Sequence, residues 1–178
     1  MLTAFTLASS LALGTAATAS ASDPAFLGYG WPKSGSITVI PLNSWSYNSV
    51  WQPAMDQGML NWNGSPAHIL FSKTSKSPNT VVAASYTATW YGLNSPKTDW
   101  LIWSKLNSFQ IQLNARTISR DAKNVPNFIQ SVFAHELGHS VWLADNPPET
   151  WSLMNYSRDR NTVTKPASVD VTRVNTKY

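Results

Sequence analysis

Short apolar runs and one alternating segment predict strands in the first two thirds of the chain. The segments 36–42, 68–71 and 80–84 are rich in apolar or β-branched residues, and 109–113 alternates strictly between apolar and polar positions. A fifth candidate strand lies at 87–91. The pattern therefore predicts a sheet built from short strands.

Apolar residues three and four positions apart predict three helices. The first spans 49–62, where Trp and Met residues recur at helical spacing, and the second starts at 124–126 and carries one apolar face. A short third helix begins near Pro166 and closes the chain at Tyr178. Strands that come first, with helices mixed in, predict a three-layer α/β or an α+β domain.

The composition predicts one globular domain with a substantial core. Of 178 residues, 43% are hydrophobic and only 12% are charged, which excludes a disordered chain and a coiled coil. The net charge is +4, but Lys and Arg are scattered singly, so we expect no nucleic-acid partner. We also expect a monomer. Cysteine is absent, which excludes disulfides and a thiolate metal site.

The first 21 residues have the pattern of a secretory signal peptide. An apolar stretch from Leu2 to Leu13 is followed by small residues up to Ala21, after which we expect cleavage. The alternative is a buried N-terminal helix. Thr, Ser and Gly interrupt the stretch, whereas a membrane span needs about 20 continuous apolar residues. We therefore expect a secreted, extracellular protein without membrane insertion, with one domain over 22–178.

The candidate chemistry lies on the second predicted helix, in the sequence His135-Glu-Leu-Gly-His139. A step of four residues places both imidazoles on one face of a helix, about 6 Å apart along its axis, so the two can bind one metal ion. Glu136 then stands beside the first ligand and can act as general base toward a water that zinc activates. The motif predicts metal-assisted hydrolysis.

A zinc site needs a third protein ligand, and the candidates are His68 or a carboxylate. The spacing favours Asp145. A helix continued beyond His139 would carry Asp145 about 9 Å further along its axis, so the chain has to turn back between the two. Pro147 stops the helix, because the residue before a proline is pushed out of helical geometry. His68 lies in an apolar run and is predicted to be an ordinary strand residue.

Two segments carry a resemblance to a known clan of enzymes. The segment from His135 to Asp145 resembles the zinc-binding consensus of the metzincin peptidases, and Ser152-Leu-Met-Asn-Tyr156 resembles their Met-turn. The tracts 90–93, 156–161 and 168–178 further resemble small secreted bacterial matrixin-like peptidases. The resemblance implies an α+β fold with a twisted, mostly parallel sheet, an active-site helix, a Met-turn and a C-terminal helix.

The resemblance also implies a role for each matching residue. It implies one catalytic zinc ion, held by His135, His139 and Asp145. Met154 would form an apolar floor beneath the ion. Tyr156 would contact the metal or the oxyanion of the transition state, and its alternative is a half-buried core residue. The strand at 87–91 would be the edge strand along which a peptide substrate lies antiparallel.

Two positions depart from the clan's pattern. Asp145 stands where a third histidine is usual, which resembles the snapalysin branch and makes the zinc a weaker acid. Trp142 stands at a turn position where the clan has glycine, because the backbone there needs a positive φ. Either Trp142 is strained, or the turn moves by one residue and Asp145 misses the metal.

Three functional hypotheses follow from the sequence. The first is a secreted zinc endopeptidase that acts on proteins or peptides, with Glu136 as general base. The second is a catalytically inactive, peptidase-like secreted binding protein. The third is a zinc peptidase of another clan, with Asp159 or Asp170 as the downstream ligand. We expect no structural zinc or calcium site, because acidic clusters are lacking.

Overall fold

The computed structural model describes residues 25–32, 36–39 and 49–178. The predicted signal peptide at 1–21 and the last part of the predicted strand at 36–42 lie outside these residues. Within the described ranges, no helix has the length and apolar character that crossing a membrane requires.

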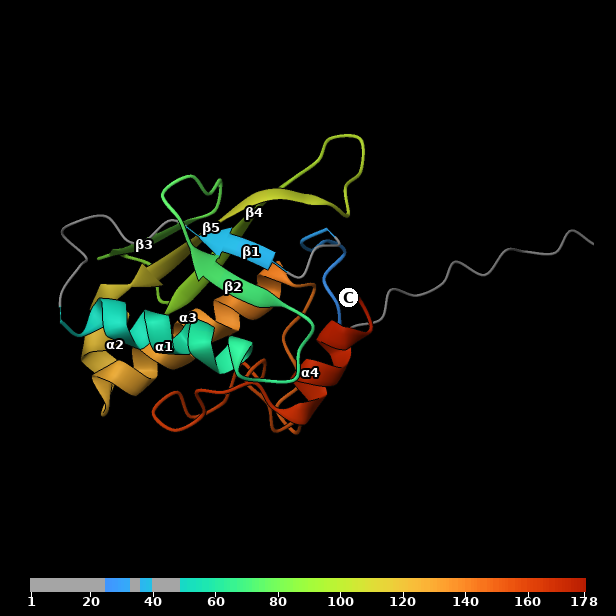
Figure 1. Ribbon diagram of the computed structural model, residues 1–178. Coiled ribbons are helices and arrows are strands. Elements are labelled where there is room, and N and C mark those ends of the chain that lie inside the picture. The colour runs from blue at the N-terminus through green and yellow to red at the C-terminus, as the bar shows by residue number, and fades with distance from the viewer. Residues whose placement is uncertain (1–24, 33–35, 40–48) are drawn as a thin grey trace, which may run out of the picture.

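The strands of the described residues form two small sheets (Figure 1), and the side chain of one buried asparagine links them. Asn79 is completely buried, donates from Nδ2 to the Thr38 carbonyl (2.8 Å) and accepts at Oδ1 from the Phe109 N–H (3.1 Å). The first sheet pairs β1 and β2 in parallel, and the second has the order β3-β5-β4, with β3 parallel and β4 antiparallel to β5. The bounds are Ser36–Val39 for β1, Leu70–Lys73 for β2, Thr80–Ala84 for β3, Gly92–Thr98 for β4 and Leu106–Asn114 for β5.

The strand predictions at 80–84 and, within a longer strand, at 109–113 are confirmed, whereas the prediction at 87–91 is wrong. In that segment, side chains bind the carbonyl groups that a strand would use for its ladder. Asn114 donates to the carbonyls of Ala88 and Trp90, and Arg116 donates to three carbonyls over 86–88. The segment is therefore a loop, and the neighbouring strand begins only at Gly92.

All three predicted helices are present, and the structure adds a short fourth. Asn124 caps the central helix by accepting the Asn127 N–H at 3.1 Å, and Pro126 lies in the first turn. The added helix has seven residues, which is too short for a helical period to show in the sequence. The bounds are Trp51–Asn63 for α1, Ala115–Asp121 for α2, Val125–Ser140 for α3 and Ser168–Asn175 for α4.

Helices α1 and α3 pack against each other on the same side of the strands (Figure 1). Trp62 of α1 is completely buried, and its Nε1 donates to the Ala134 carbonyl of α3 at 2.8 Å. Gly58 lies so close to α3 that a Cβ there would be 3.1 Å from the Gln130 oxygen. The predicted apolar stripe of the first helix is thus core. Because α3 also packs on β4 and β5, the helix that carries the candidate ligands is fixed from two sides.

Candidate metal centre

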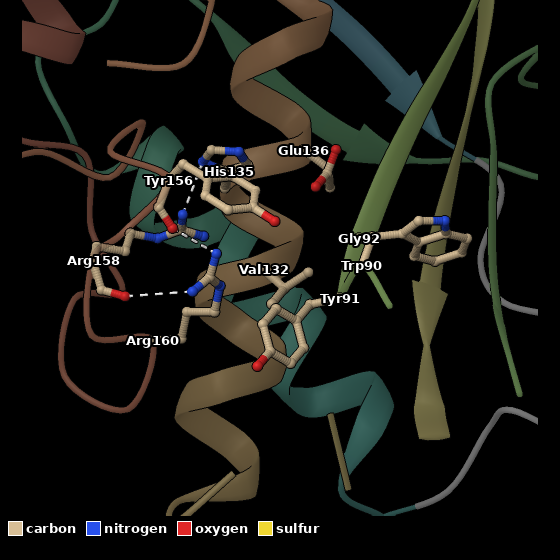
Figure 2. Close-up of a pocket in the computed structure, with 9 residues that line it drawn as sticks. All are labelled: Trp90, Tyr91, Gly92, Val132, His135, Glu136, Tyr156, Arg158 and Arg160. Carbon is tan, nitrogen blue, oxygen red and sulfur yellow. Dashed lines mark hydrogen bonds between the residues drawn. The ribbon is translucent and has the colours of Figure 1, made fainter. Parts of the chain in front are cut away.

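Helix α3 brings the three residues of the predicted motif together. The candidate ligand atoms of His135, Glu136 and His139 all lie within 4.8 Å of one another, and the centroids of the two imidazoles are 4.7 Å apart. His135 and Glu136 are each only 5% exposed. In Figure 2, the Glu136 carboxyl points toward the strand segment that carries Gly92. The four-residue spacing therefore produces the shared face that it predicts.

Backbone carbonyls orient both imidazole rings. Nδ1 of His135 lies 3.0 Å from the Leu153 oxygen, and Nδ1 of His139 lies 2.8 Å from the Leu143 oxygen. When Nδ1 carries the proton and donates it to the carbonyl, Nε2 is free to bind a cation. Burial, followed by the positive charge of Arg158, lowers the pKa of His135 and keeps this ring neutral, as a metal ligand has to be.

Asp145 lies within reach of both imidazoles. Its Oδ1 is 3.1 Å from Nε2 of His135 and 3.9 Å from Nε2 of His139, and its side chain is half exposed. The chain reverses just after α3, where the Leu143 N–H donates to the Gly138 carbonyl at 3.2 Å. This reversal brings Asp145 back to the face of the helix that carries both rings, as the spacing argument requires.

Trp142 makes the turn with a left-handed backbone. Its φ is 78°, the only positive φ of a non-glycine residue in the described part of the chain. Of the two alternatives for this position, the structure therefore shows the strained residue, while the turn stays in place. The strain costs on the order of 1 kcal/mol or more. It is offset because the indole packs against Gly30, which has no Cβ in the way, and donates from Nε1 to the Trp31 carbonyl at 3.2 Å.

Met154 packs on α3 between the two residues that carry the imidazoles. It is 1% exposed, and its sulfur packs directly against Gly138, the helix residue that precedes His139. Its carbonyl accepts the Asn146 N–H at 2.7 Å, which joins the turn to the segment after Asp145. An apolar side chain therefore packs on the helix between the two candidate ligands, and its role as a floor beneath a metal ion stays a prediction.

Asp170, one of the alternative ligands, has a different role. It is completely buried, and its Oδ2 accepts the N–H groups of Leu153 (2.9 Å) and Ala167 (2.8 Å). Its Oδ1 accepts from Nδ2 of Asn146 at 3.2 Å. The carboxylate therefore holds α4, the Met-turn and the segment after Asp145 together, and its oxygens are already used.

Asp159 and His68 also lie away from the cluster. The Asp159 carboxylate is exposed and accepts from the backbone and side chain of Asn161 at 2.9 and 3.0 Å. His68 is exposed and precedes β2, which starts two residues later than predicted. Its N–H donates to the Asn175 side chain at 2.7 Å, and this bond to α4 replaces strand pairing. The strand prediction for His68 is therefore wrong.

The candidate site opens into a cavity of about 290 Å³. Tyr156, at its edge, is 58% exposed and so does not belong to the core, which was the alternative for this residue. Its backbone carbonyl accepts from the Arg160 guanidinium at 2.7 Å. The cavity is lined by the N-terminal residues Leu27 and Tyr29, the strand residues Gly92, Leu93 and Asn94, and His135, Glu136, His139, Asp145 and Tyr156.

Burial makes Glu136 an unusually weak carboxylic acid. It raises the pKa of Glu136 to about 7, against the opposing charges of His139 and Arg158. The backbone carbonyl of Glu136 accepts from Nδ2 of Asn94 at 2.7 Å, which fixes the helix to β4 at this point. A carboxyl with a pKa near neutrality is suited to take a proton and give it back.

Sequence reasoning missed Arg158, which lies behind His135 (Figure 2). Its side chain is buried and donates to the hydroxyl and the carbonyl of Ser131, both at 3.0 Å, and to the Asn155 carbonyl at 3.1 Å. One guanidinium nitrogen lies 3.0 Å from Nδ1 of His135. Arg158 therefore fixes the segment after the Met-turn to the helix that carries the ligands. Nothing in the local sequence marks it, because its partners lie 3 to 27 positions away.

Comparisons with known proteins find similarity in the three-dimensional fold but not in the sequence. No protein-family model matches the sequence, and no curated protein matches it. A chain in the GM1-bound form of the ECX AB5 holotoxin is similar with a TM-score of 0.56 and 12% identity, over 87% of this chain and 86% of that chain. High choriolytic enzyme 1, a hatching-enzyme zinc protease from the medaka Oryzias latipes, gives a TM-score of 0.49 and 15% identity, over 82% and 92%.

The similarity to the holotoxin chain shows the fold alone. The identities are too low to transfer an activity or a ligand to this chain. The predicted fold class is confirmed, since the described residues combine four helices with one parallel and one mixed sheet in the α+β arrangement. The roles of the site residues rest on their geometry.

Proposed function

We propose that the chain is a secreted zinc endopeptidase. The observation that carries the proposal is the convergence of two imidazole nitrogens and the Asp145 carboxylate, with the Glu136 carboxyl beside them in the same cavity. The donor set fits zinc, which binds nitrogen and oxygen ligands and, in catalytic sites, keeps one position open. Both rings present Nε2 with Nδ1 held by a carbonyl, as a zinc-binding histidine requires.

Zinc held by His135, His139 and Asp145 would act as a Lewis acid and lower the pKa of a bound water toward about 7. Glu136 then takes the proton from the attacking water on its carboxylate and passes it to the nitrogen of the leaving amine. The Tyr156 hydroxyl, at the edge of the cavity, donates a hydrogen bond to the developing oxyanion.

The free edge of β4 is suited to bind the substrate peptide. Within the described sheets, β4 pairs with β5 on one side only, so the backbone groups on its other side are available to an added strand. Gly92, at the start of β4, lies directly against the side chains of Glu136 and Val132, so a peptide paired with this strand would pass close to the Glu136 carboxyl. This strand takes the substrate-binding role that the sequence analysis gives to 87–91.

The direct test compares cleavage of casein and of a fluorogenic peptide by the wild-type chain and by Glu136→Gln. We expect the variant to lose about 100- to 10,000-fold in activity. It should retain about one zinc ion per chain in elemental analysis, because no ligand changes. Asp159→Asn, away from the cluster, is the matched control. Equal cleavage by wild type and Glu136→Gln would refute the proposed function.

The same measurements separate the other hypotheses. A chain without zinc and without cleavage would support the inactive binding protein. That hypothesis depends on a turn that moves at Trp142, so that Asp145 misses the metal. The turn stays in place and Asp145 lies next to the imidazoles, which argues against it. Zinc retained undiminished by Asp145→Ala would support a different third ligand.

Secretion and the monomeric state are further parts of the proposal. The pattern over 1–21 supports export, and mass spectrometry of the protein in the culture medium should find Ser22 as its first residue. Size-exclusion chromatography should give a mass of about 17.6 kDa for such a monomer, because loss of residues 1–21 removes about 2 kDa from the 19.6 kDa chain.

A further inference from the structure

The loop between β4 and β5 exposes four successive large apolar residues, which we call the hairpin tip. The exposed fractions are 79% for Trp100, 69% for Leu101, 55% for Ile102 and 77% for Trp103. Figure 1 shows this loop, in yellow-green, projecting beyond the strands. The four side chains present on the order of 600 Å² of apolar surface, which is large for one patch on a monomer.

The backbone of the hairpin tip is paired within the loop. The Asp99 carboxylate accepts the N–H groups of Leu101 (2.9 Å) and Ile102 (3.3 Å), and the Ile102 carbonyl accepts the Lys105 N–H at 2.8 Å. The Asp99 N–H donates to the Lys105 carbonyl at 2.8 Å. An unpaired backbone group is costly to bring into an apolar medium, so this pairing lowers the cost of burying the tip. It also holds the side chains outward.

Positive charge lies at the base of the hairpin tip. Lys97 on β4 and Lys105 after the tip are both exposed, and Lys105 and Lys177 line a neighbouring cavity of about 230 Å³ together with Trp31 and other residues. Asp99 is the carboxylate among them, and its Oδ1 already accepts the tip's own amides. The loop thus presents an apolar end with cations behind it, which matches the order of layers in an anionic bilayer surface.

We propose that the hairpin tip docks onto a bilayer surface that contains anionic lipids. Leu101 and Ile102 enter the boundary of the acyl chains, the flanking Trp100 and Trp103 lie at headgroup level, and the lysines contact lipid phosphates. The association is peripheral and involves no membrane-spanning segment. None of the four tip residues lines the cavities described above, so the tip is a convex probe rather than a groove for a peptide.

The area of the hairpin tip favours lipid over a second copy of the chain. Two facing tips would bury about 1,200 Å² in total, which is at the lower limit for a stable protein interface. The tip also lies at the opposite end of β4 from Gly92, seven residues or about 20 Å away, so docking leaves the candidate metal centre accessible.

A fluorescent probe on the tip tests the proposal. The chain has no cysteine, so Ile102→Cys labelled with the environment-sensitive dye NBD reports from this position alone. This matters because the apolar stretch 2–13 could bind vesicles by itself. With vesicles of phosphatidylcholine and about one third phosphatidylglycerol, we expect brighter, blue-shifted emission, weakened by high salt and in pure phosphatidylcholine. Unchanged emission with the anionic vesicles would overturn the proposal.

Vesicle flotation with matched variants provides the second readout. The double variant Trp100→Ser and Trp103→Ser should bind anionic vesicles about tenfold more weakly than the wild-type chain. Trp151→Ser removes an equally exposed tryptophan elsewhere (74%) and should leave binding unchanged. Equal loss in both variants would contradict a specific tip. A lipid-free dimer that the double variant abolishes would assign the tip to a second copy instead.

Discussion

Replacing Trp142 by alanine and, separately, by glycine separates the cost of its backbone from the contribution of its indole. Both variants lose the packing on Gly30 and the hydrogen bond to Trp31, so this loss cancels when the two are compared. At an ordinary position, alanine is more stable than glycine by about 0.5–1 kcal/mol. At the observed φ of 78°, a Cβ costs about 1–2 kcal/mol, so glycine should be the more stable variant by about 0.5–1 kcal/mol.

Urea unfolding followed by far-UV circular dichroism measures both free energies. Each variant should be less stable than wild type, by about 2–3 kcal/mol, because a partly buried tryptophan contributes less than the 3–5 kcal/mol of a core residue. Thr172, exposed on α4, is the control position, where alanine should exceed glycine by about 1 kcal/mol. If alanine equals or exceeds glycine at position 142 as well, the backbone there is not left-handed, and the account of how Asp145 reaches the imidazoles fails.

Further substitutions test the site and its support. Asp145→Ala should weaken zinc binding about 100-fold or more in chelator competition, and an unchanged affinity would exclude it as a ligand. Gly92→Ala places a methyl group against the Glu136 carboxyl and the buried Val132 side chain, so kcat should fall about 100-fold and the unfolding midpoint should also fall; full activity would argue against this contact. Asp170→Asn weakens the bonds to the Leu153 N–H and its neighbours and should cost about 2–4 kcal/mol by calorimetry, and a loss under about 0.5 kcal/mol would show that the carboxylate is dispensable.

Periodicity predicted the elements whose faces differ in burial. The alternation at 109–113 and the helical spacing in α1 and α3 reflect surfaces that pack on one side, and these predictions hold. Strand β4 escaped prediction because it is a half-exposed edge that contains Pro96, which an edge tolerates. The error at 87–91 arose because Asn114 and Arg116, far along the chain, bind that segment's carbonyls.

In the candidate site, too, local spacing predicts some residues, whereas others depend on contacts between distant parts of the chain. The convergence of His135 and His139 follows from helix geometry alone, and so could be read from spacing. The outcome at Trp142 could not, because it depends on a hydrogen bond to a residue 111 positions earlier. Arg158 was likewise invisible, since its partners are backbone atoms and a hydroxyl that only the folded chain assembles.

The bonds of Asp170 determine when, during synthesis of the chain, the candidate site can take its final geometry. This carboxylate holds the Leu153 N–H, while the carbonyl of the same residue orients the His135 ring. A ribosome releases position 170 well after the motif on α3, so a nascent chain carries the candidate ligands before it has the carboxylate that fixes them. The geometry of the centre therefore completes only after α4 has been made, and a chain that stops before α4 should carry the motif without its fixed geometry.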